Sequence, residues 1–231
     1  MPLLCQSSPA PVHRPTPRHL ALSGLAVGGR HICAMLTRRI TLLAAVLLPL
    51  PARAQAAAVE VVERFHAALI AVMRDATRLG VRGRHDRLAP ALAQSFDLPA
   101  MTRIAVGPPW SGFTPAEQAA LTEAFTRWTM ATYAARFDGF SGESFTTTGT
   151  QVQPNGDTLV RTTLNRTGGQ EPVLLSYLLR GASPRIVDIY LTGTISELAS
   201  RRAEFTALLR EGGAQRIIQE LQARTARLMA A

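Results

Sequence analysis

Lysine is absent from the sequence, and cysteine is nearly so. All 25 basic residues are arginines, and the two cysteines, Cys5 and Cys33, lie close to the N-terminus. The chain after Cys33 therefore has no thiol, which excludes a disulfide, a cysteine nucleophile and a thiolate metal site from that part. No cysteine follows the apolar run described next, so a lipoprotein anchor is not expected.

Long hydrophobic runs are also missing. The apolar run from Ile40 to Leu50 is shorter than the roughly 20 residues that a bilayer span needs. It follows Arg38 and Arg39 and precedes Ala52-Arg53-Ala54, which is the pattern of a secretory signal peptide beginning at Met35. We expect cleavage after Ala54, or after Ala56, by the general or the twin-arginine export route. Residues 1–54 are thus predicted to be an upstream tail and signal peptide, and residues 55–231 a single exported domain.

Acidic residues are absent from residues 1–54, which hold six of the arginines. The net charge of the whole chain is +9, but the remaining 19 arginines face 16 acidic residues, which leaves +3 for the exported part. Basic and acidic residues alternate there, as in "RRAEF" and "REGGAQRIIQE", and no basic stripe interleaved with aromatics occurs. This distribution argues against nucleic-acid binding.

Catalytic motifs are missing as well. The exported part holds only His66 and His85, no G-x-S-x-G serine motif, no set of metal ligands at the usual spacing and no glycine-rich phosphate loop. Asp138 and Glu143 flank a loop and are interpreted as solvated acids. The sequence therefore predicts neither an enzyme nor a cofactor. A small enzyme that uses His66 or Asp188 as a base is kept as an alternative.

The first half of the exported part has helical periodicity. Residues 59–78 place apolar side chains at helical spacing, and residues 84–107 indicate two short helices broken near Ser95 and Phe96, with Asp97 as an N-cap. Residues 114–137 give the clearest helix, because Thr114 and Glu117 match a capping box with Pro115 at the first helical position.

The second half changes to strand patterns and then returns to helices. Four short runs, residues 142–153, 157–166, 172–180 and 185–193, are rich in Thr, Val, Ile, Leu and Tyr and are separated by Gly- and Pro-containing turns. Helices are expected over 195–211 and 214–229, with a Thr194–Glu197 capping box and a break at Gly212-Gly213. The predicted fold is α+β: an antiparallel sheet of about four strands packed by N-terminal and C-terminal helices. One arginine of the pair Arg201-Arg202 is expected to be structural and the other solvated.

The order of three segments resembles the MlaC-type family. They are "FDLPAMTRIAVGPPW" (96–110), "TPAEQAALTEAFTRWTMATYAARFDGFSGE" (114–143) and "RIVDIYLTGTISELASRRAEFTALLREGGAQRIIQEL" (185–221). Members of this family, also called toluene-tolerance proteins, are periplasmic phospholipid carriers that serve an ABC lipid transporter and outer-membrane lipid asymmetry. The segment "GTISELASRRAEF" is similar to the hopanoid-biosynthesis-associated (HpnM-type) branch, which leaves a hopanoid as an alternative ligand.

The resemblance implies a periplasmic carrier with an apolar cavity between helices and sheet. Its expected partners are a membrane lipid, an inner-membrane ABC transporter complex and an outer-membrane lipoprotein complex. Arg103 is expected at the mouth of the cavity, or alternatively on the helix surface paired with Asp97 or Glu123. A protein with a filled core that assembles with a membrane complex is a further alternative. The residues expected to line or close the cavity are Val106, Trp110, Phe125, Trp128, Tyr133, Phe137, Leu175, Tyr177, Leu179 and Ile189.

Overall fold

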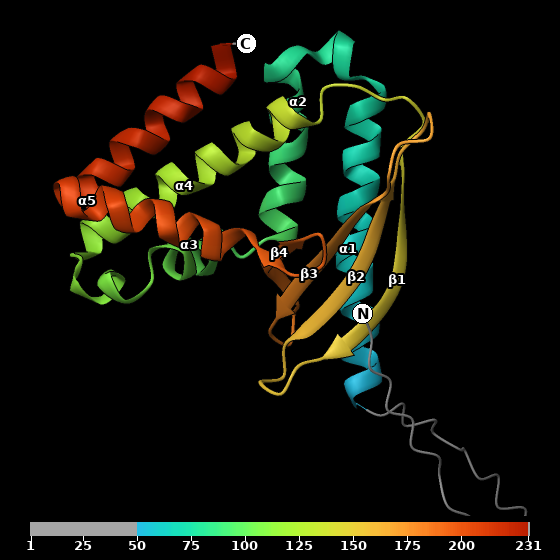
Figure 1. Ribbon diagram of the computed structural model, residues 1–231, viewed down its shortest axis with the longest axis horizontal. Coiled ribbons are helices and arrows are strands. Elements are labelled where there is room, and N and C mark those ends of the chain that lie inside the picture. The colour runs from blue at the N-terminus through green and yellow to red at the C-terminus, as the bar shows by residue number, and fades with distance from the viewer. Residues whose placement is uncertain (1–49, 231) are drawn as a thin grey trace, which may run out of the picture. The chain divides into compact units, whose positions relative to one another are not determined.

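The structure is a computed structural model that describes residues 50–230 (Figure 1). The predicted tail and most of the predicted signal peptide lie outside these residues, and the expected cleavage point after Ala54 lies within the first helix. No helix within the described range is both long and apolar enough to cross a membrane. In chain order the elements are α1 (Leu50–Arg74), α2 (Ala76–Ser95), α3 (Leu98–Val106), the 3-10 helix η1 (Pro108–Gly112), α4 (Pro115–Arg136), β1 (Ser144–Val152), β2 (Thr158–Asn165), β3 (Val173–Arg180), β4 (Arg185–Leu191), β5 (Ile195–Ser196) and α5 (Glu197–Ala230).

The strands form one antiparallel sheet in which each strand pairs with the next along the chain, in the order β1-β2-β3-β4-β5. The predicted α+β class and the four-strand meander are therefore confirmed, with the two-residue β5 added at one edge. Phe96, between α2 and α3, forms an isolated parallel bridge with Ile186 of β4. This bridge fixes the helical layer against one end of the sheet.

Two predicted helix starts are confirmed in atomic detail. Asp97 accepts a hydrogen bond from the Ala100 amide at 3.1 Å and begins α3. Thr114 and Glu117 form both hydrogen bonds of a capping box at the start of α4. The Thr114 amide and the Thr114 hydroxyl both donate to the Glu117 carboxylate, and these two bonds lower the pKa of Glu117.

The predicted first helix, residues 59–78, is divided in the structure: α1 ends at Arg74, Asp75 forms a turn, and α2 begins at Ala76. The backbone breaks again at Gly80, with a φ of 59° and a ψ of 179°, two residues after the predicted end.

The predicted capping box at Thr194 is wrong. The Thr194 amide donates to the Leu191 carbonyl in a turn, and Ile195 and Ser196 pair with β4, so the helix begins only at Glu197. Ser196 is the cap, since its hydroxyl accepts from the Ala199 amide at 2.9 Å. The Thr-x-x-Glu spacing predicts a capping box at Thr194. In the structure, the backbone of Ile195 and Ser196 is paired with β4, so these residues cannot form the first turn of a helix.

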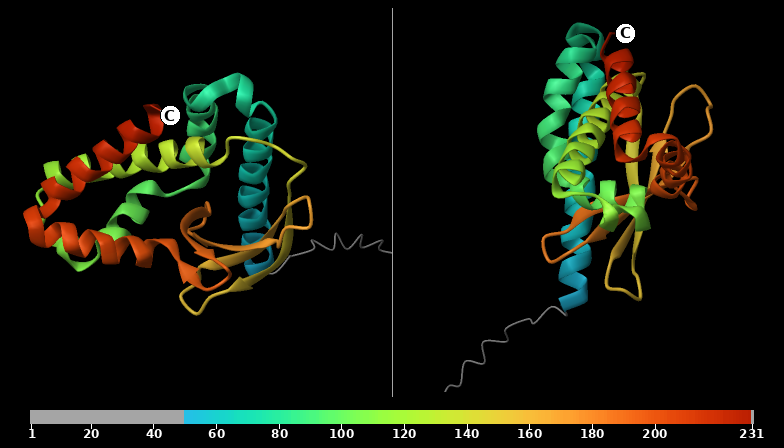
Figure 2. Two further views of the ribbon diagram at one scale, coloured as in Figure 1. Left: turned by 45° about the horizontal axis from the view of Figure 1, so that its top comes forward. Right: turned by 90° about the vertical axis from the view of Figure 1, so that its left-hand side faces the viewer.

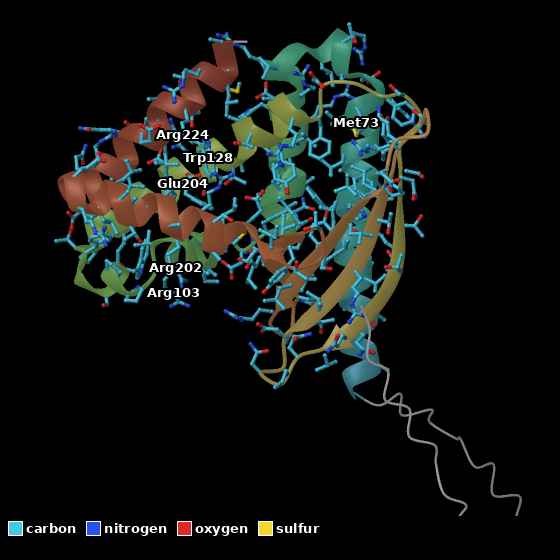
Figure 3. The ribbon with its side chains drawn as sticks, viewed as in Figure 1. Met73, Arg103, Trp128, Arg202, Glu204 and Arg224 are labelled. Atoms are coloured by element: carbon cyan, nitrogen blue, oxygen red, sulfur yellow. The ribbon has the colours of Figure 1, made fainter. Side chains whose placement is uncertain are left out.

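Helix α5 is broken at the predicted Gly212-Gly213, where Gly213 has a φ of 63°. Its second half turns back, and the long helix packs chiefly against α4 (Figure 2). Glu204 before the break and Arg224 after it form an ion pair at 3.0 Å, which links the two halves (Figure 3). Phe205, Ile217 and Leu221 are buried beneath this helical hairpin.

Candidate functional site

A pocket with an apolar lining lies between α4, the first turns of α5 and the inner face of the sheet. The empty space within it is about 820 Å³, including the part open to solvent. The lining residues are Leu69, Phe96, Met101, Phe125, Trp128, Thr129, Thr132, Tyr133, Arg136, Phe137, Phe145, Leu175, Tyr177, Ile189, Leu191, Glu197, Leu198 and Arg201.

Most of the residues predicted for the cavity line this pocket. Helix α4 supplies Phe125, Trp128 and Tyr133, followed by Phe137 just after its end, because these positions repeat at helical spacing. The sheet supplies Leu175 and Tyr177 of β3 and Ile189 of β4, whose Tyr177–Ile189 pairing places them side by side. The structure therefore brings these seven residues together, while their contact with a lipid stays a prediction.

The other four predicted residues lie away from the pocket lining. Val106 and Leu179 are buried core residues, and Trp110 lies on η1 with its ring 6.5 Å from that of Phe113. Arg103 is an exposed residue of α3 and lies near Arg202 in Figure 3. Within the described range, Arg103 forms no ion pair with Asp97 or Glu123, and Glu123 pairs instead with Arg127 at 2.6 Å.

Several lining residues are not among those expected from the sequence. Phe96 and Met101 come from the α2–α3 region, Phe145 from β1, and Leu69 from α1. Their apolar character was a usable signal, but nothing in their spacing separates a pocket wall from ordinary core. Glu197, Leu198 and Arg201 reach the pocket because β5 places the start of α5 beside β4.

Polar groups gather on the side of the pocket where α4 meets α5. Thr129, Tyr133 and Arg136 lie on one face of α4, and we call them the α4 polar stripe. Opposite them, Glu197 and Arg201 of α5 form an ion pair at 3.3 Å. Arg136 is exposed, whereas Phe125 and Leu198 are buried, so the polar side lies toward solvent and the apolar side inward.

Arg201 joins the two helices that border the pocket. Its guanidinium carbon lies 4.7 Å from the centroid of the Trp128 ring, and it also pairs with Glu204 at 3.0 Å. Arg202 instead donates to the Ile104 carbonyl at the end of α3, with its Nε 3.1 Å away. Both arginines therefore make tertiary contacts. Arg202 is exposed, as expected of the solvated member of the pair, but it also connects α5 to α3.

A wall of three rings separates the main pocket from a second hollow between α1 and β1. The His66 ring is stacked on Phe145 at 3.8 Å, and its Nε2 lies 2.9 Å from the Tyr177 hydroxyl. Burial lowers the pKa of His66 from 6.5 to about 4, so this imidazole is neutral at pH 7. The second hollow is lined by Glu63, His66, Ala67, Ile70, Ala71, Arg74, Glu143, Ser144, Phe145 and Thr147.

The Asp188 carboxylate is hydrogen-bonded to β4 and to the start of α5, so its role is structural. Its Oδ1 accepts from the amides of Ile189 and Leu198, and its Oδ2 accepts from the Ser196 hydroxyl at 2.6 Å. Burial raises its pKa, while these three hydrogen bonds act in the opposite direction. The carboxylate thus anchors the start of α5 to β4. Among residues 50–230, no group of three or more His, Cys, Asp or Glu side chains could hold a metal ion.

Comparisons with known proteins agree with this architecture. The chain matches no curated protein sequence. Its fold is similar to that of a phospholipid-binding protein from Ralstonia solanacearum that was solved in complex with a phospholipid. That match has a TM-score of 0.64 and 23% identity, and it covers 76% of this chain and 98% of the other. The family model for the MlaC protein matches residues 63–223, and the chain therefore belongs to the MlaC protein family.

Proposed function

We propose that this protein is a periplasmic carrier that binds a membrane phospholipid and moves it between the inner and outer membranes. In this proposal its partners are an inner-membrane ABC-type lipid transporter and an outer-membrane lipoprotein complex. The observation that carries the proposal is the pocket between α4 and the sheet, which is apolar inside and polar toward solvent. Family membership and the phospholipid bound by the Ralstonia protein support the same ligand class.

The physical need for such a carrier follows from the hydrophobic effect. Each methylene removed from water contributes about 0.8 kcal/mol, so a lipid with roughly 25 to 30 methylenes leaves a membrane very slowly unless another apolar site accepts it. Phe125, Leu175 and Ile189 offer such a surface for acyl chains. Binding of this kind needs no cofactor and no chemical step on the carrier.

We propose binding rather than catalysis because the two candidate bases are committed to the fold. His66 is bonded to Tyr177, and Asp188 holds the start of α5. A hopanoid remains the alternative ligand suggested by the C-terminal segment. Identification of the bound lipid distinguishes it from a phospholipid.

The test is to purify the protein gently, extract it with organic solvent and identify the lipids by mass spectrometry. The pocket variant is Leu175→Trp, because Leu175 lines the pocket and a larger ring fills it. The matched control is Leu174→Trp, since adjacent strand residues point to opposite faces and Leu174 is 53% exposed. We expect phospholipid in the wild type and in the control, and several-fold less in Leu175→Trp.

Transfer provides the second measurement. Delipidated wild-type protein should take up labelled phospholipid from vesicles, and Leu175→Trp should take up less. Circular dichroism and thermal melting establish that both variants are folded. Absence of lipid from the purified protein, together with no uptake from vesicles, would refute the carrier proposal and favour an assembly role.

A further inference from the structure

We propose that the α4 polar stripe, Thr129, Tyr133 and Arg136, is a subsite for the phosphate of an anionic lipid head group. This inference rests on the proposed function and extends it from lipid binding in general to selection of a lipid by its phosphate. The three residues are spaced by four and three positions, so they share one face of α4, and all three line the pocket.

The Thr129 hydroxyl is available to a ligand. On the same helix, Thr122 and Thr132 donate to the carbonyls of Gln118 and Trp128, four residues earlier, at 2.8 Å each. Thr129 makes no hydrogen bond through its side chain within the described residues, although only 8% of the residue is exposed. Arg185 Nε is the fully buried side-chain polar atom without a partner in the described range, so the Thr129 Oγ1 is accessible, and a ligand oxygen in the pocket could accept its hydrogen bond.

The Tyr133 hydroxyl is in the same situation. Its ring is stacked on Phe137 at 5.6 Å and packs against Phe65, but in the described part of the chain its hydroxyl has no partner. Tyr177, which also lines the pocket, is bonded to His66. Burial raises the pKa of Tyr133, so its phenol keeps the proton and can donate it to an anionic oxygen.

Arg136 supplies the charge. It is the last residue of α4 and exposed, and it forms no ion pair with any residue in the 50–230 range. Arg201 also lines the pocket, but Glu197 and Glu204 neutralise it. The pocket lining therefore holds two arginines and one glutamate, and Arg136 has no carboxylate partner among residues 50–230.

These three donors fit a phosphodiester. Such a group has one negative charge and several acceptor oxygens, and hydrogen bonds to a charged partner are about twice as strong as neutral ones. A diacylglycerol or an uncharged polycyclic lipid has no such group. The apolar interior can accept the chains of any of these lipids, so the α4 polar stripe is the part of the pocket that would discriminate among them.

The experiment measures extraction from vesicles that hold phosphatidylglycerol and diacylglycerol with identical acyl chains in equal amounts. Wild-type protein should extract phosphatidylglycerol preferentially, and Arg136→Gln should reduce this preference about tenfold, which corresponds to 1.4 kcal/mol. Arg136→Lys should keep most of it. Thr129→Val and Tyr133→Phe remove only the hydroxyls and should each reduce it several-fold.

The control variant is Arg127→Gln, because Arg127 lies on the same helix, has 69% of its side chain exposed and pairs with Glu123 outside the pocket. It should extract both lipids as the wild type does. Equal extraction of both lipids by the wild type, or an unchanged preference in Arg136→Gln, would overturn the subsite while the carrier function stands. Extraction of neither lipid would overturn the proposed function, and the subsite with it.

A third arm separates a lipid head group from free phosphate. Inorganic phosphate is titrated into delipidated protein by calorimetry. The absence of binding assigns the subsite to a phosphate attached to acyl chains. Binding that Arg136→Gln abolishes would make free phosphate the ligand and would overturn the assignment to a lipid.

Discussion

The guanidinium of Arg201 lies 4.7 Å from the centroid of the Trp128 ring and connects α5 to α4 at the edge of the pocket. Arg201 also pairs with Glu197 and Glu204, and its side chain is 20% exposed. A cation over an aromatic face contributes about 0.5–2 kcal/mol, and each partly exposed ion pair contributes less than about 1 kcal/mol. This contact therefore stabilises the border of the pocket.

We predict that Arg201→Met lowers the free energy of unfolding by about 1–2 kcal/mol, measured by urea denaturation. In a double-mutant cycle with Trp128→Leu, the coupling energy should be about 1 kcal/mol. Arg127→Met serves as the control and should change the stability by less than about 0.5 kcal/mol, because the partner of Arg127 among the described residues is an exposed glutamate on its own helix. If the losses of unfolding free energy in Arg201→Met and Trp128→Leu were fully additive, the result would argue against an energetic contact between the two side chains.

Gly107 adopts a φ of 76° and a ψ of −150°, where side chains are strained, and a Cβ there would lie 3.0 Å from Nε of Arg202. Gly107→Ala should lower the free energy of unfolding by about 2–3 kcal/mol. Gly112→Ala should have little effect, since a Cβ at that position meets nothing within 4 Å. The cost of Gly107→Ala should shrink in an Arg202→Met background. An equal loss of unfolding free energy in both backgrounds would mean that the Arg202 side chain does not clash with a Cβ at position 107.

His66 should make the stability depend on pH. Its pKa is about 4 in the folded protein and about 6.5 when unfolded, so protonation favours unfolding. The contribution is complete above pH 6.5 and is lost as the pH falls toward 4. Between pH 7 and pH 5 the free energy of unfolding should drop by about 2 kcal/mol on this account. Urea denaturation of His66→Gln should show a smaller drop, and an equal drop in both proteins would contradict the assignment.

Asp188 should prove structural. Asp188→Ala leaves the Leu198 amide without its acceptor and should cost about 2–4 kcal/mol of unfolding free energy. The control is Asp86→Ala on α2, whose side chain is 80% exposed, with a change below about 0.5 kcal/mol. Lipid uptake per folded molecule should be unchanged in Asp188→Ala. A normal melting temperature with loss of uptake would place Asp188 in the binding machinery instead.

The sequence predicts the elements better than the outline of the pocket. Thr114 with Glu117, and Asp97 before α3, are local signals, and both act locally in the structure. Thr194 with Glu197 is an equally good local signal, but pairing of Ser196 with Tyr190 in the sheet overrides it. Patterns within a few residues are thus reliable only where no distant strand competes for the same backbone.

The pocket outline depends on contacts between distant segments. Alternation along β3 groups Leu175, Tyr177 and Leu179, but Leu179 pairs with Ile186, which Phe96 bridges from the helical layer. That end of the sheet is therefore closed, and Leu179 is buried in the core. The Thr129 hydroxyl could not be recognised either, because the sequence does not tell which threonines of a helix bond to their own backbone.

The position of Trp128 gives the protein an intrinsic optical reporter. The chain has two tryptophans, of which Trp128 lines the pocket and Trp110 lies outside it. A Trp110→Phe variant would leave Trp128 as the single tryptophan, whose emission depends on the polarity of the pocket and on the Arg201 cation above its ring. Filling and emptying of the pocket could then be followed in real time without a labelled lipid.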